Sequence, residues 1–283
     1  MTDKYAVIGN PITHSKSPLI HRVFAEQTGQ DISYEVILAP LDGFAATVER
    51  LRKEGYKGCN VTVPFKFEAF NIATELSERA RSAQAVNTLS FDGCTILGDN
   101  TDGAGLVRDI EQNLKLTLQD HNVLLLGAGG AAWGVSLPLL ESGANIYNYN
   151  RTPDKAQQLS HALQIFLKRD LYTRKGLKYG LPNFVNSYAE LSSKQFDFII
   201  NATSAGLTDS EISLPETIFA PGALAYDMMY GRETPFMRFA REQGAQVSDG
   251  LGMLVEQAAE AFYIWRGVRP DTAPVIAALR AAK

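Results

Sequence analysis

The order of apolar and polar positions in the first hundred residues predicts alternating strands and helices. Short β-type runs and helix-type segments follow each other at residues 5–8, 18–27, 33–37, 41–53 and 58–63. Because parallel neighbours need a crossover connection, this βαβαβ order favours a mainly parallel sheet with helices on both faces. A polar helix is then expected over residues 68–81, followed by two short strands near 87–91 and 95–97.

A second α/β series follows the amphipathic segment 106–114. Its strands are expected at residues 123–126, 146–149, 196–201 and 224–227. Residues 123–140 carry no charge and are close to the minimum length of a membrane span, but four glycines and Pro138 favour a strand, a turn and a helix. Two helices, 253–266 and 274–282, are expected after them. The whole pattern predicts an α/β fold.

The segment 166–183 carries five basic side chains with little periodicity. We expect an exposed insertion, built as a solvated loop or a short helix, because charge runs usually face water. A basic groove is the alternative interpretation.

Length, charge and cysteine content limit the classes of protein. At roughly 150 residues per domain, 283 residues favour two domains. Lys and Arg total 27 against 31 Asp and Glu, so the net charge of -4 provides no overall basic field for nucleic acid or an anionic membrane. Cys59 and Cys94 suggest neither a zinc site nor a disulfide framework, and the N-terminus does not resemble a secretory signal. We therefore expect a cytoplasmic protein.

A glycine cluster follows the strand expected at residues 123–126. A Rossmann turn needs a glycine for its tight bend, a second where backbone approaches the pyrophosphate, and a small third residue for helix packing. Gly127, Gly129 and Ala132 occupy these places. Tight turns without a ligand also use glycine, but the strand before the cluster and the helix after it favour a dinucleotide site.

The end of the next strand indicates which dinucleotide is preferred. NAD enzymes usually place an acid about 20 residues further on to bind the ribose 2′-hydroxyl, whereas an arginine there accommodates a 2′-phosphate. Here Asn150 and Arg151 stand at the strand end, and Lys155 lies one helical turn later. NADP(H) is therefore predicted. The alternative is that both cations only decorate a helix start, where the positive dipole end makes them mildly unfavourable.

Polar clusters occupy the loops after the first predicted strands, where an open parallel sheet exposes its ligand crevice. Ser15 and Ser17 present hydroxyls ahead of a helix N-terminus and suit either a carboxylate ligand or a helix cap. His14 and His21 have no partner acid nearby, so we expect surface residues rather than a metal pair.

Lys66 and Asp102 are the candidate acid–base pair. Lys66 opens the helix after the strand that carries Thr62, and a lysine can protonate or orient an oxygen. Asp102 supplies a carboxylate in the loop 98–103. The alternatives are an ordinary surface lysine and a helix N-cap, and the spacing does not decide whether the two residues converge.

Nine ordered motifs resemble those of the shikimate dehydrogenase family over essentially the whole chain. They are Ser15-Lys16-Ser17-Pro18, Asn60-Val61-Thr62-Val63-Pro64-Phe65-Lys66, Ala85-Val86-Asn87-Thr88, Gly98-Asp99-Asn100-Thr101-Asp102-Gly103, the glycine turn at 127–132, Asn150-Arg151-Thr152, Asn201-Ala202-Thr203-Ser204, Tyr226-Asp227-Met228-Met229-Tyr230 and Asp249-Gly250-Leu251-Gly252-Met253-Leu254. The resemblance implies an N-terminal α/β substrate domain with a mainly parallel sheet, completed by C-terminal helices, over residues 1–103 and 250–283. It implies an inserted Rossmann NADP-binding domain over residues 104–249.

The resemblance also implies a role for each matching residue. Ser15 and Ser17 would hold the substrate carboxylate. Thr62, Asn87 and Gln257 would bind ring hydroxyls. Lys66 and Asp102 would contact the substrate as the catalytic pair, with Tyr230 nearby. The implied cofactor-binding residues are Gly127, Ala128, Gly129, Gly130, Ala131, Asn150, Arg151, Thr152, Lys155, Thr203, Met228 and Gly250.

The implied activity is the reversible NADPH-dependent reduction of 3-dehydroshikimate to shikimate, within aromatic amino-acid biosynthesis. No metal, nucleic acid or membrane partner is expected, and a homodimer is compatible with this interpretation. A quinate/shikimate dehydrogenase with broader substrate range or NAD use is the nearer alternative, against which Arg151 argues. A non-catalytic NADP-binding regulator is the more distant one, against which the presence of Lys66, Asp102 and Gln257 argues.

Overall fold

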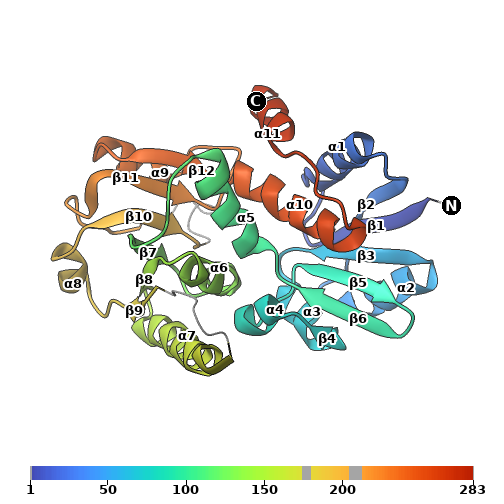
Figure 1. Ribbon diagram of the computed structural model, residues 1–283, viewed down its shortest axis with the longest axis horizontal. Coiled ribbons are helices and arrows are strands. Elements are labelled where there is room, and N and C mark those ends of the chain that lie inside the picture. Colours follow the sequence, from blue (N-terminus) through green and yellow to red (C-terminus); the bar gives the residue numbers. More distant parts are fainter. Residues whose placement is uncertain (1, 174–179, 204–211, 283) are drawn as a thin grey trace. The chain divides into compact units, whose positions relative to one another are not determined.

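The structure is a computed structural model that describes residues 2–173, 180–203 and 212–282. The chain divides into two compact units, of which unit 1 comprises Met1–Gly105 and Leu254–Lys283 and unit 2 comprises Leu106–Met253. Each unit is built on a six-stranded sheet with helices packed against it, as Figure 1 shows. The predicted α/β fold is confirmed.

Unit 1 has the strand order β2-β1-β3-β5-β6-β4. Three of its five strand pairings are parallel, and the two pairings of β5 are antiparallel. The strands are β1 (Asp3–Gly9), β2 (Ile32–Leu38), β3 (Tyr56–Val61), β4 (Glu75–Leu76), β5 (Thr88–Asp92) and β6 (Thr95–Asp99). The helices are α1 (Ser17–Thr28), α2 (Phe44–Lys53), α3 (Lys66–Ile72), α4 (Glu78–Ala83), α5 (Asp102–Arg108), α10 (Leu251–Arg266) and α11 (Ala273–Ala281).

Successive residues of β1 point to opposite faces of the sheet, which places a layer of helices on each side. Ala6 and Ile8 belong to the apolar core that also contains Phe44 of α2. On the other face, Tyr5 stacks on Trp265 of α10, with ring centroids 4.5 Å apart. The first strand is thus buried on both sides, which fixes the loop that follows it.

Unit 2 has the strand order β12-β11-β10-β7-β8-β9, and every described pairing is parallel. Counted from β7 along the chain, this is the Rossmann order, in which ligands bind at the carboxyl ends of the two central strands, here β7 and β10. The strands are β7 (Asn122–Leu126), β8 (Asn145–Tyr149), β9 (Pro182–Phe184), β10 (Phe196–Asn201), β11 (Phe219–Asp227) and β12 (Gln246–Asp249). The helices are a π-helical turn (Asp109–Asn113) after α5, α6 (Gly130–Glu141), α7 (Pro153–Thr173), α8 (Tyr188–Ser192) and α9 (Pro235–Glu242).

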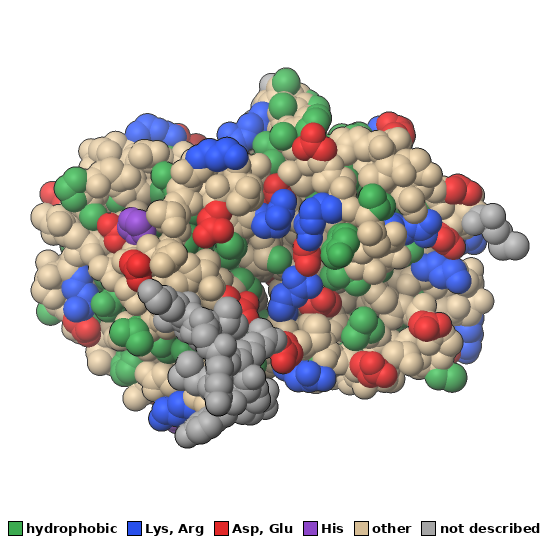
Figure 2. Space-filling view, in the orientation of Figure 1, with side chains coloured by type: hydrophobic (Ala, Val, Ile, Leu, Met, Phe, Trp, Pro, Cys, Tyr) green, Lys and Arg blue, Asp and Glu red, His purple; other side chains and the backbone are tan. Residues whose placement is uncertain are grey.

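The uncharged stretch 123–140 forms β7, a turn and most of α6, as expected. Within the described ranges, no helix combines the length and the apolar character needed to cross a membrane. On the face shown in Figure 2, acidic and basic side chains are interspersed. This distribution is consistent with the small net charge.

The prediction of a single polar helix over residues 68–81 is wrong. The helix α3 ends at Ile72, and α4 begins at Glu78. Between them the chain joins the sheet, because Thr74 N donates to the Ile96 carbonyl of β6 at 2.9 Å. Ser77 then starts a new helix, since its Oγ accepts a hydrogen bond from the N–H three residues later at 3.1 Å.

The prediction of an exposed insertion at residues 166–183 is also corrected by the structure. The helix α7 continues to Thr173, and β9 adds an edge strand from Pro182. Leu167 is only 8% exposed and, with Phe166, packs on the core of unit 2. The contacts of Phe166 and Leu167 with the core therefore make the start of this segment part of a helix rather than an exposed loop. Residues 174–179 lie outside the described ranges.

Candidate functional site

An ion pair between Lys66 and Asp102 forms the centre of the candidate site in unit 1. Lys66 is the first residue of α3, and Asp102 is the first residue of α5. Lys66 Nζ lies 2.5 Å from Asp102 Oδ2, and the two side chains are 23% and 8% exposed. The two residues therefore converge, which their spacing had left open. The Asp102 carboxylate is engaged by side chains, so it is more than a helix cap.

Asn87 holds the second oxygen of this carboxylate. Its Nδ2 donates to Asp102 Oδ1 at 2.8 Å, and its Oδ1 accepts from Thr101 N at 2.9 Å. Gln257 Oε1 lies 3.4 Å from Thr101 Oγ1 and 3.5 Å from Asn87 Nδ2. The structure thus brings four of the predicted site residues, Lys66 among them, into one hydrogen-bonded cluster that includes the unpredicted Thr101.

Ser15 and Thr62 lie on the loops that follow β1 and β3, and Ser17 is the first residue of α1, directly after the first of these loops. These strands are parallel neighbours, so both loops emerge at the same edge of the sheet. Ser15 Oγ accepts a hydrogen bond from Ser17 N at 3.3 Å. The residue at the N-cap of α1 is Lys16, which makes no side-chain cap. Of the expected helix capping by the two serines, the structure therefore shows only this hydrogen bond within the turn before α1.

Asn60 lies behind the cluster and was given no role on sequence grounds. It is 7% exposed, and its Nδ2 donates to Thr88 Oγ1 at 3.1 Å and to the Asn87 carbonyl at 3.3 Å. Its Oδ1 accepts a hydrogen bond from the Tyr34 hydroxyl at 2.7 Å. A buried amide at the end of an apolar strand was the available signal for Asn60, whereas nothing in the sequence pattern marked Tyr34.

His21 is not the surface residue that was expected. It is fully buried on the inner face of α1, and its ring stacks on that of Tyr34, with centroids 4.1 Å apart and an interplanar angle of 8°. Burial lowers the pKa of His21 to about 3, against a weaker opposing effect of the neighbouring Asn60 side chain. Within the described residues, neither ring nitrogen meets hydrogen-bond geometry. His14 is exposed, as expected.

The glycine cluster forms the turn between β7 and α6 in unit 2. Gly127 has φ +109°, where glycine is favoured, and a Cβ there would lie 3.2 Å from the Ala202 carbonyl oxygen at the end of β10. An added Cβ on Gly129, the N-cap of α6, would meet nothing within 4 Å. Ala132 is fully buried. Ala128 and the amides of the first turn of α6, including those of Gly130 and Ala131, lie at the place where a Rossmann fold binds a diphosphate.

Asn148 of β8 holds this turn, and sequence reasoning missed it. Its side chain is buried, and Nδ2 donates to the Gly127 carbonyl at 2.7 Å and to the Leu125 carbonyl at 3.1 Å. The Gly127 N–H in turn donates to the Tyr149 carbonyl at 2.8 Å. An asparagine facing into an otherwise apolar strand pair was the signal that could have identified it.

The predicted 2′-phosphate residues follow β8. Asn150 Nδ2 donates to the Thr152 carbonyl at 2.9 Å, and this turn leads into α7, where Lys155 lies in the first turn. The side chains of Arg151 and Lys155 are exposed. With no acid at this strand end, a planar guanidinium and an ammonium group suit a phosphate better than a ribose hydroxyl.

Three further predicted cofactor residues lie together at the ends of β10, β11 and β12. Thr203 Oγ1 donates to Asn201 Oδ1 at 2.7 Å, and Met228 N donates to the Asn201 carbonyl at 3.1 Å. A Cβ on Gly250 would lie 2.4 Å from the Met228 carbonyl oxygen, so only glycine fits there. Ser204, the last residue of that motif, lies outside the described ranges.

Asp227 organises the loop that carries Tyr230. This carboxylate accepts hydrogen bonds from Thr234 Oγ1 at 2.5 Å, Met229 N at 2.9 Å and Asn201 Nδ2 at 3.1 Å. Burial raises the pKa of Asp227, although these three donors oppose the shift. Tyr230 is half-buried, and burial raises the pKa of its hydroxyl as well. The Asp227 carboxylate, for which the sequence predicted no role, therefore sets the geometry of this loop.

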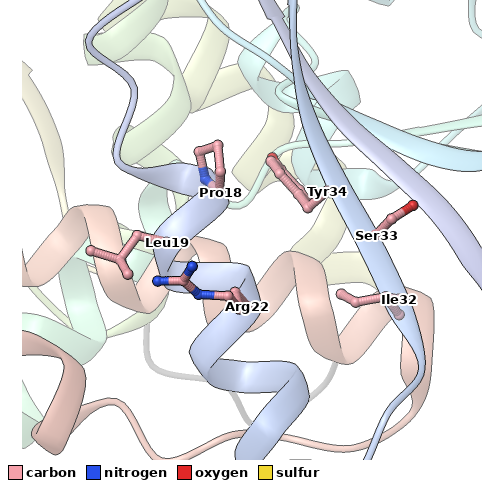
Figure 3. Close-up of a pocket in the computed structure, with 6 residues that line it drawn as sticks. All are labelled: Pro18, Leu19, Arg22, Ile32, Ser33 and Tyr34. Atoms are coloured by element: carbon pink, nitrogen blue, oxygen red, sulfur yellow. The ribbon is translucent and has the colours of Figure 1, made fainter.

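A groove of about 350 Å³ lies between α1 and β2, as Figure 3 shows. Pro18, Leu19 and Arg22 line it from the helix, and Ile32, Ser33 and Tyr34 line it from the strand. Neither Lys66 nor Asp102 is part of its lining. Tyr34 is the lining residue that connects this groove to the hydrogen-bonded cluster. Across the described residues, no group of three or more His, Cys, Asp or Glu could hold a metal ion.

Known proteins resemble the chain over its whole length. The family model for the shikimate dehydrogenase substrate binding domain matches residues 7–89, and the model for the shikimate 5′-dehydrogenase C-terminal domain matches residues 250–280. The shikimate dehydrogenase (NADP(+)) of Methylobacillus flagellatus is 60% identical over 282 residues, which cover 99% of this chain and 100% of that protein. A crystal structure of an Ael1 enzyme from Pseudomonas putida superposes with a TM-score of 0.87 at 47% identity, covering 98% of each chain. The shikimate 5-dehydrogenase of Thermus thermophilus, solved in complex with NADP(H) and shikimate, superposes with a TM-score of 0.84 at 31% identity over 100% of both chains.

Proposed function

Because the chain belongs to the shikimate dehydrogenase family, we propose that it catalyses the reversible NADPH-dependent reduction of 3-dehydroshikimate to shikimate. The observation that carries this proposal is the Lys66–Asp102 pair, 2.5 Å apart, with Asn87 on the second carboxylate oxygen. A proton donor among groups that bind hydroxyls suits a ring that carries a ketone and hydroxyls. The activity belongs to aromatic amino-acid biosynthesis.

The residues of unit 2 fit NADP(H). The backbone at Gly129 has open space beside it, and the first-turn amides of α6 favour an anion. Arg151 and Lys155 are exposed beyond the end of β8, and Asn150 stands at the strand end where NAD enzymes usually place an acid. On the nicotinamide side, we assign Thr203, Met228 and the close-packed Gly250.

When bound, NADPH supplies the hydride that reduces the ring carbonyl carbon. Lys66 would give a proton from Nζ to the carbonyl oxygen as it becomes a hydroxyl, and would take that proton back in the reverse direction. The ammonium group also stabilises negative charge that develops on this oxygen. Asp102 holds Nζ in place through Oδ2, while Asn87 fixes the carboxylate through Oδ1.

The remaining residues of unit 1 hold the substrate. Ser15 and Ser17 would bind the carboxylate of the substrate at the N-terminal end of α1, where the helix dipole favours an anion. Thr62 and Gln257 would bind ring hydroxyls, and Gln257 is supported by its contacts with Thr101 and Asn87. Tyr230 is proposed to reach the substrate from the loop after β11.

This assignment gives the substrate domain residues 1–103 and 250–283 and the NADP domain residues 104–249. The division of the chain after Gly105 and before Leu254 supports it. Separate expression of residues 104–249 tests it, because that segment should bind NADPH without turning over substrate. Failure of a folded segment to bind NADPH would contradict the assignment.

The decisive experiment follows NADPH absorbance after addition of 3-dehydroshikimate to the purified protein. We expect oxidation of NADPH, and reduction of NADP+ when shikimate is supplied instead. Tight NADPH binding with no absorbance change in either direction would contradict the enzyme assignment and favour the regulator. Parallel assays with NADH and with quinate distinguish the family member with broader specificity, because a chain that depends on Arg151 for the 2′-phosphate should prefer NADPH.

We also propose a reducing, cytoplasmic location. Cys59 is buried and Cys94 is exposed, and both thiols are free. An exposed free thiol is typical of proteins that do not pass through an oxidising compartment. Fractionation of cells that express the chain tests this, and recovery in an extracytoplasmic fraction would contradict it.

A homodimer is proposed on the basis of the edge strand β2. Val36 and Leu38 are 39% and 60% exposed, and Leu41 just beyond the strand is 66% exposed. Apolar side chains along an unpaired strand edge are typical of a surface that associates with another copy. Light scattering of the purified chain, with Leu38→Lys as the comparison, tests this; a monomeric mass for the unmodified chain would contradict it.

A further inference from the structure

An unbroken series of hydrogen bonds leads from Tyr34 to the carboxylate of Asp102. The Tyr34 hydroxyl donates to Asn60 Oδ1 at 2.7 Å, and Asn60 Nδ2 donates to Thr88 Oγ1 at 3.1 Å. Thr88 Oγ1 donates to Asn87 Oδ1 at 2.9 Å, and Asn87 Nδ2 donates to Asp102 Oδ1 at 2.8 Å. The other carboxylate oxygen meets Lys66.

All four of these bonds are donated in the same direction, toward the negative charge. Each donor in such a series polarises the next one, so the bonds strengthen one another in a low-dielectric interior. Asn60, Thr88 and Asn87 are 7%, 1% and 3% exposed, which removes most competition from water. The series therefore acts on Asp102 as a unit, and its first member is a tyrosine on another strand.

The ring of Tyr34 is held independently of its hydroxyl. One side stacks on the neutral ring of His21, while an edge borders the groove between α1 and β2 (Figure 3). His21 is itself enclosed by aromatic rings, with the Trp265 centroid 5.5 Å away. Burial raises the pKa of the Tyr34 hydroxyl well above its ordinary value, so the hydroxyl keeps the proton that it donates. The buried ring of His21, whose nitrogens do not meet hydrogen-bond geometry within the described residues, therefore serves as a flat, uncharged surface on which the Tyr34 ring stacks.

We propose that Tyr34 is a positioning residue for the Lys66–Asp102 pair, acting through the hydrogen bonds of Asn60, Thr88 and Asn87. This inference rests on the proposed function, because it concerns the orientation of the proposed catalytic pair. It goes beyond that function by assigning a role in the reaction to a residue of β2, whose hydroxyl also lies near the Ser17 side chain. Loss of the hydroxyl leaves Asn60 held only through Nδ2, and the weaker restraint passes along the series to the Asp102 carboxylate.

The test is Tyr34→Phe, which retains the ring that stacks on His21 and removes the donor alone. We expect kcat for 3-dehydroshikimate reduction to fall about fivefold, the effect of one neutral hydrogen bond. KM for 3-dehydroshikimate and Kd for NADPH should stay within about twofold, because neither ligand is assigned a contact with Tyr34. A role in folding alone would lower the melting temperature without this separation of kcat from KM.

Tyr5→Phe is the matched control. Tyr5 is a buried tyrosine that stacks on Trp265, at the other side of the same aromatic cluster, and takes no part in the series of hydrogen bonds. It should keep kcat within about 1.5-fold of the wild type. An equal fall of kcat in Tyr5→Phe and Tyr34→Phe would overturn the proposal, since the effect would then come from the packing of the cluster.

Thr88→Val supplies a second, independent cut in the series. Val fills the same space as Thr and removes the hydroxyl between Asn60 and Asn87. We expect Thr88→Val to lower kcat and the double variant Tyr34→Phe/Thr88→Val to be no slower than the slower single variant, because either cut interrupts the same series. Multiplicative effects, or wild-type kcat in Thr88→Val, would overturn the proposal even if Tyr34→Phe failed to fold. An inactive wild type would instead remove the proposed function itself.

Discussion

Lys66 Nζ and Asp102 Oδ2 lie 2.5 Å apart although 36 residues separate them in the sequence. They follow β3 and β6, which are each hydrogen-bonded to β5, so the sheet carries both residues to one edge. Asn87, directly before β5, binds the other oxygen of the carboxylate. The geometry of the pair therefore depends on strand register more than on either loop.

Replacement of Lys66 by Ala removes the proposed proton donor. We expect kcat to fall by about 10²- to 10⁴-fold, the usual contribution of a positioned acid or base. Folding should be largely retained, because Asp102 keeps the hydrogen bond from Asn87. Steady-state kinetics and thermal melting measure the two effects. Lys53→Ala, at a lysine whose side chain is 75% exposed, serves as control; turnover of Lys66→Ala near that of the control would refute the role.

Replacement of Arg151 by Ala should weaken the response to NADPH in preference to NADH. Loss of a charge-assisted contact to the 2′-phosphate corresponds to about 1.5–3 kcal/mol, or a rise in KM for NADPH of about 10- to 100-fold. KM for NADH should change little, since NADH lacks that phosphate. Arg50→Ala, at another exposed arginine, controls for loss of a surface charge. Equal changes for both cofactors would show that Arg151 does not contact the phosphate.

Replacement of Asn148 by Leu should affect the glycine turn of unit 2. Two buried carbonyls, those of Leu125 and Gly127, would lose a donor, which costs about 1–3 kcal/mol of stability. Because Gly127 belongs to the proposed diphosphate turn, Kd for NADPH should rise as well. Fluorescence titration of NADPH and urea unfolding measure both. A stable variant with unchanged Kd would mean that the turn holds its shape without Asn148.

Much of the fold follows from local patterning. Residues 123–126 and 198–200 are continuous apolar runs, as expected for parallel strands buried on both faces, and they form the centres of β7 and β10. The turn at Gly127 could be predicted because its backbone conformation, with φ +109°, disfavours residues other than glycine. Patterning failed where tertiary contacts override local preference. The break at Thr74 depends on a carbonyl of β6, which no window of sequence around residues 68–81 contains.

The reactive groups of the site could be predicted from the sequence, but the residues that support them could not. Lys66 and Asp102 were identifiable as polar residues in loops after predicted strands, and their convergence needed strand order. His21 was misjudged because the sequence shows no partner for it, and its actual partner is the face of the Tyr34 ring. Aromatic stacking leaves no charge or spacing pattern that a single sequence could reveal.

The last prediction concerns pH and the carboxylate of Glu260 in α10. Glu260 pairs with Arg79 of α4 at 2.8 Å and with Arg269, and its side chain is 12% exposed. Burial alone would raise the pKa of Glu260, but the hydrogen bonds and charges of Arg269 and Arg79 outweigh it and lower the pKa below its ordinary value of 4.5. A lowered pKa in the folded state means that the unfolded chain binds more protons as the pH falls.

The stability that this carboxylate contributes is therefore fully present above pH 4.5 and is lost as the pH falls through the lowered pKa of the folded state. Glu260→Gln should be less stable than the wild type by about 2 kcal/mol at neutral pH, below the cost for a fully buried pair because Arg79 and Arg269 are partly exposed. Urea unfolding from neutral pH to about pH 3 should show this difference shrinking as Glu260 becomes protonated. Glu54→Gln, at an exposed pair with Arg50, should differ little from the wild type throughout. A difference for Glu260→Gln that stays constant over this range would show that Gln fails for reasons of shape rather than charge.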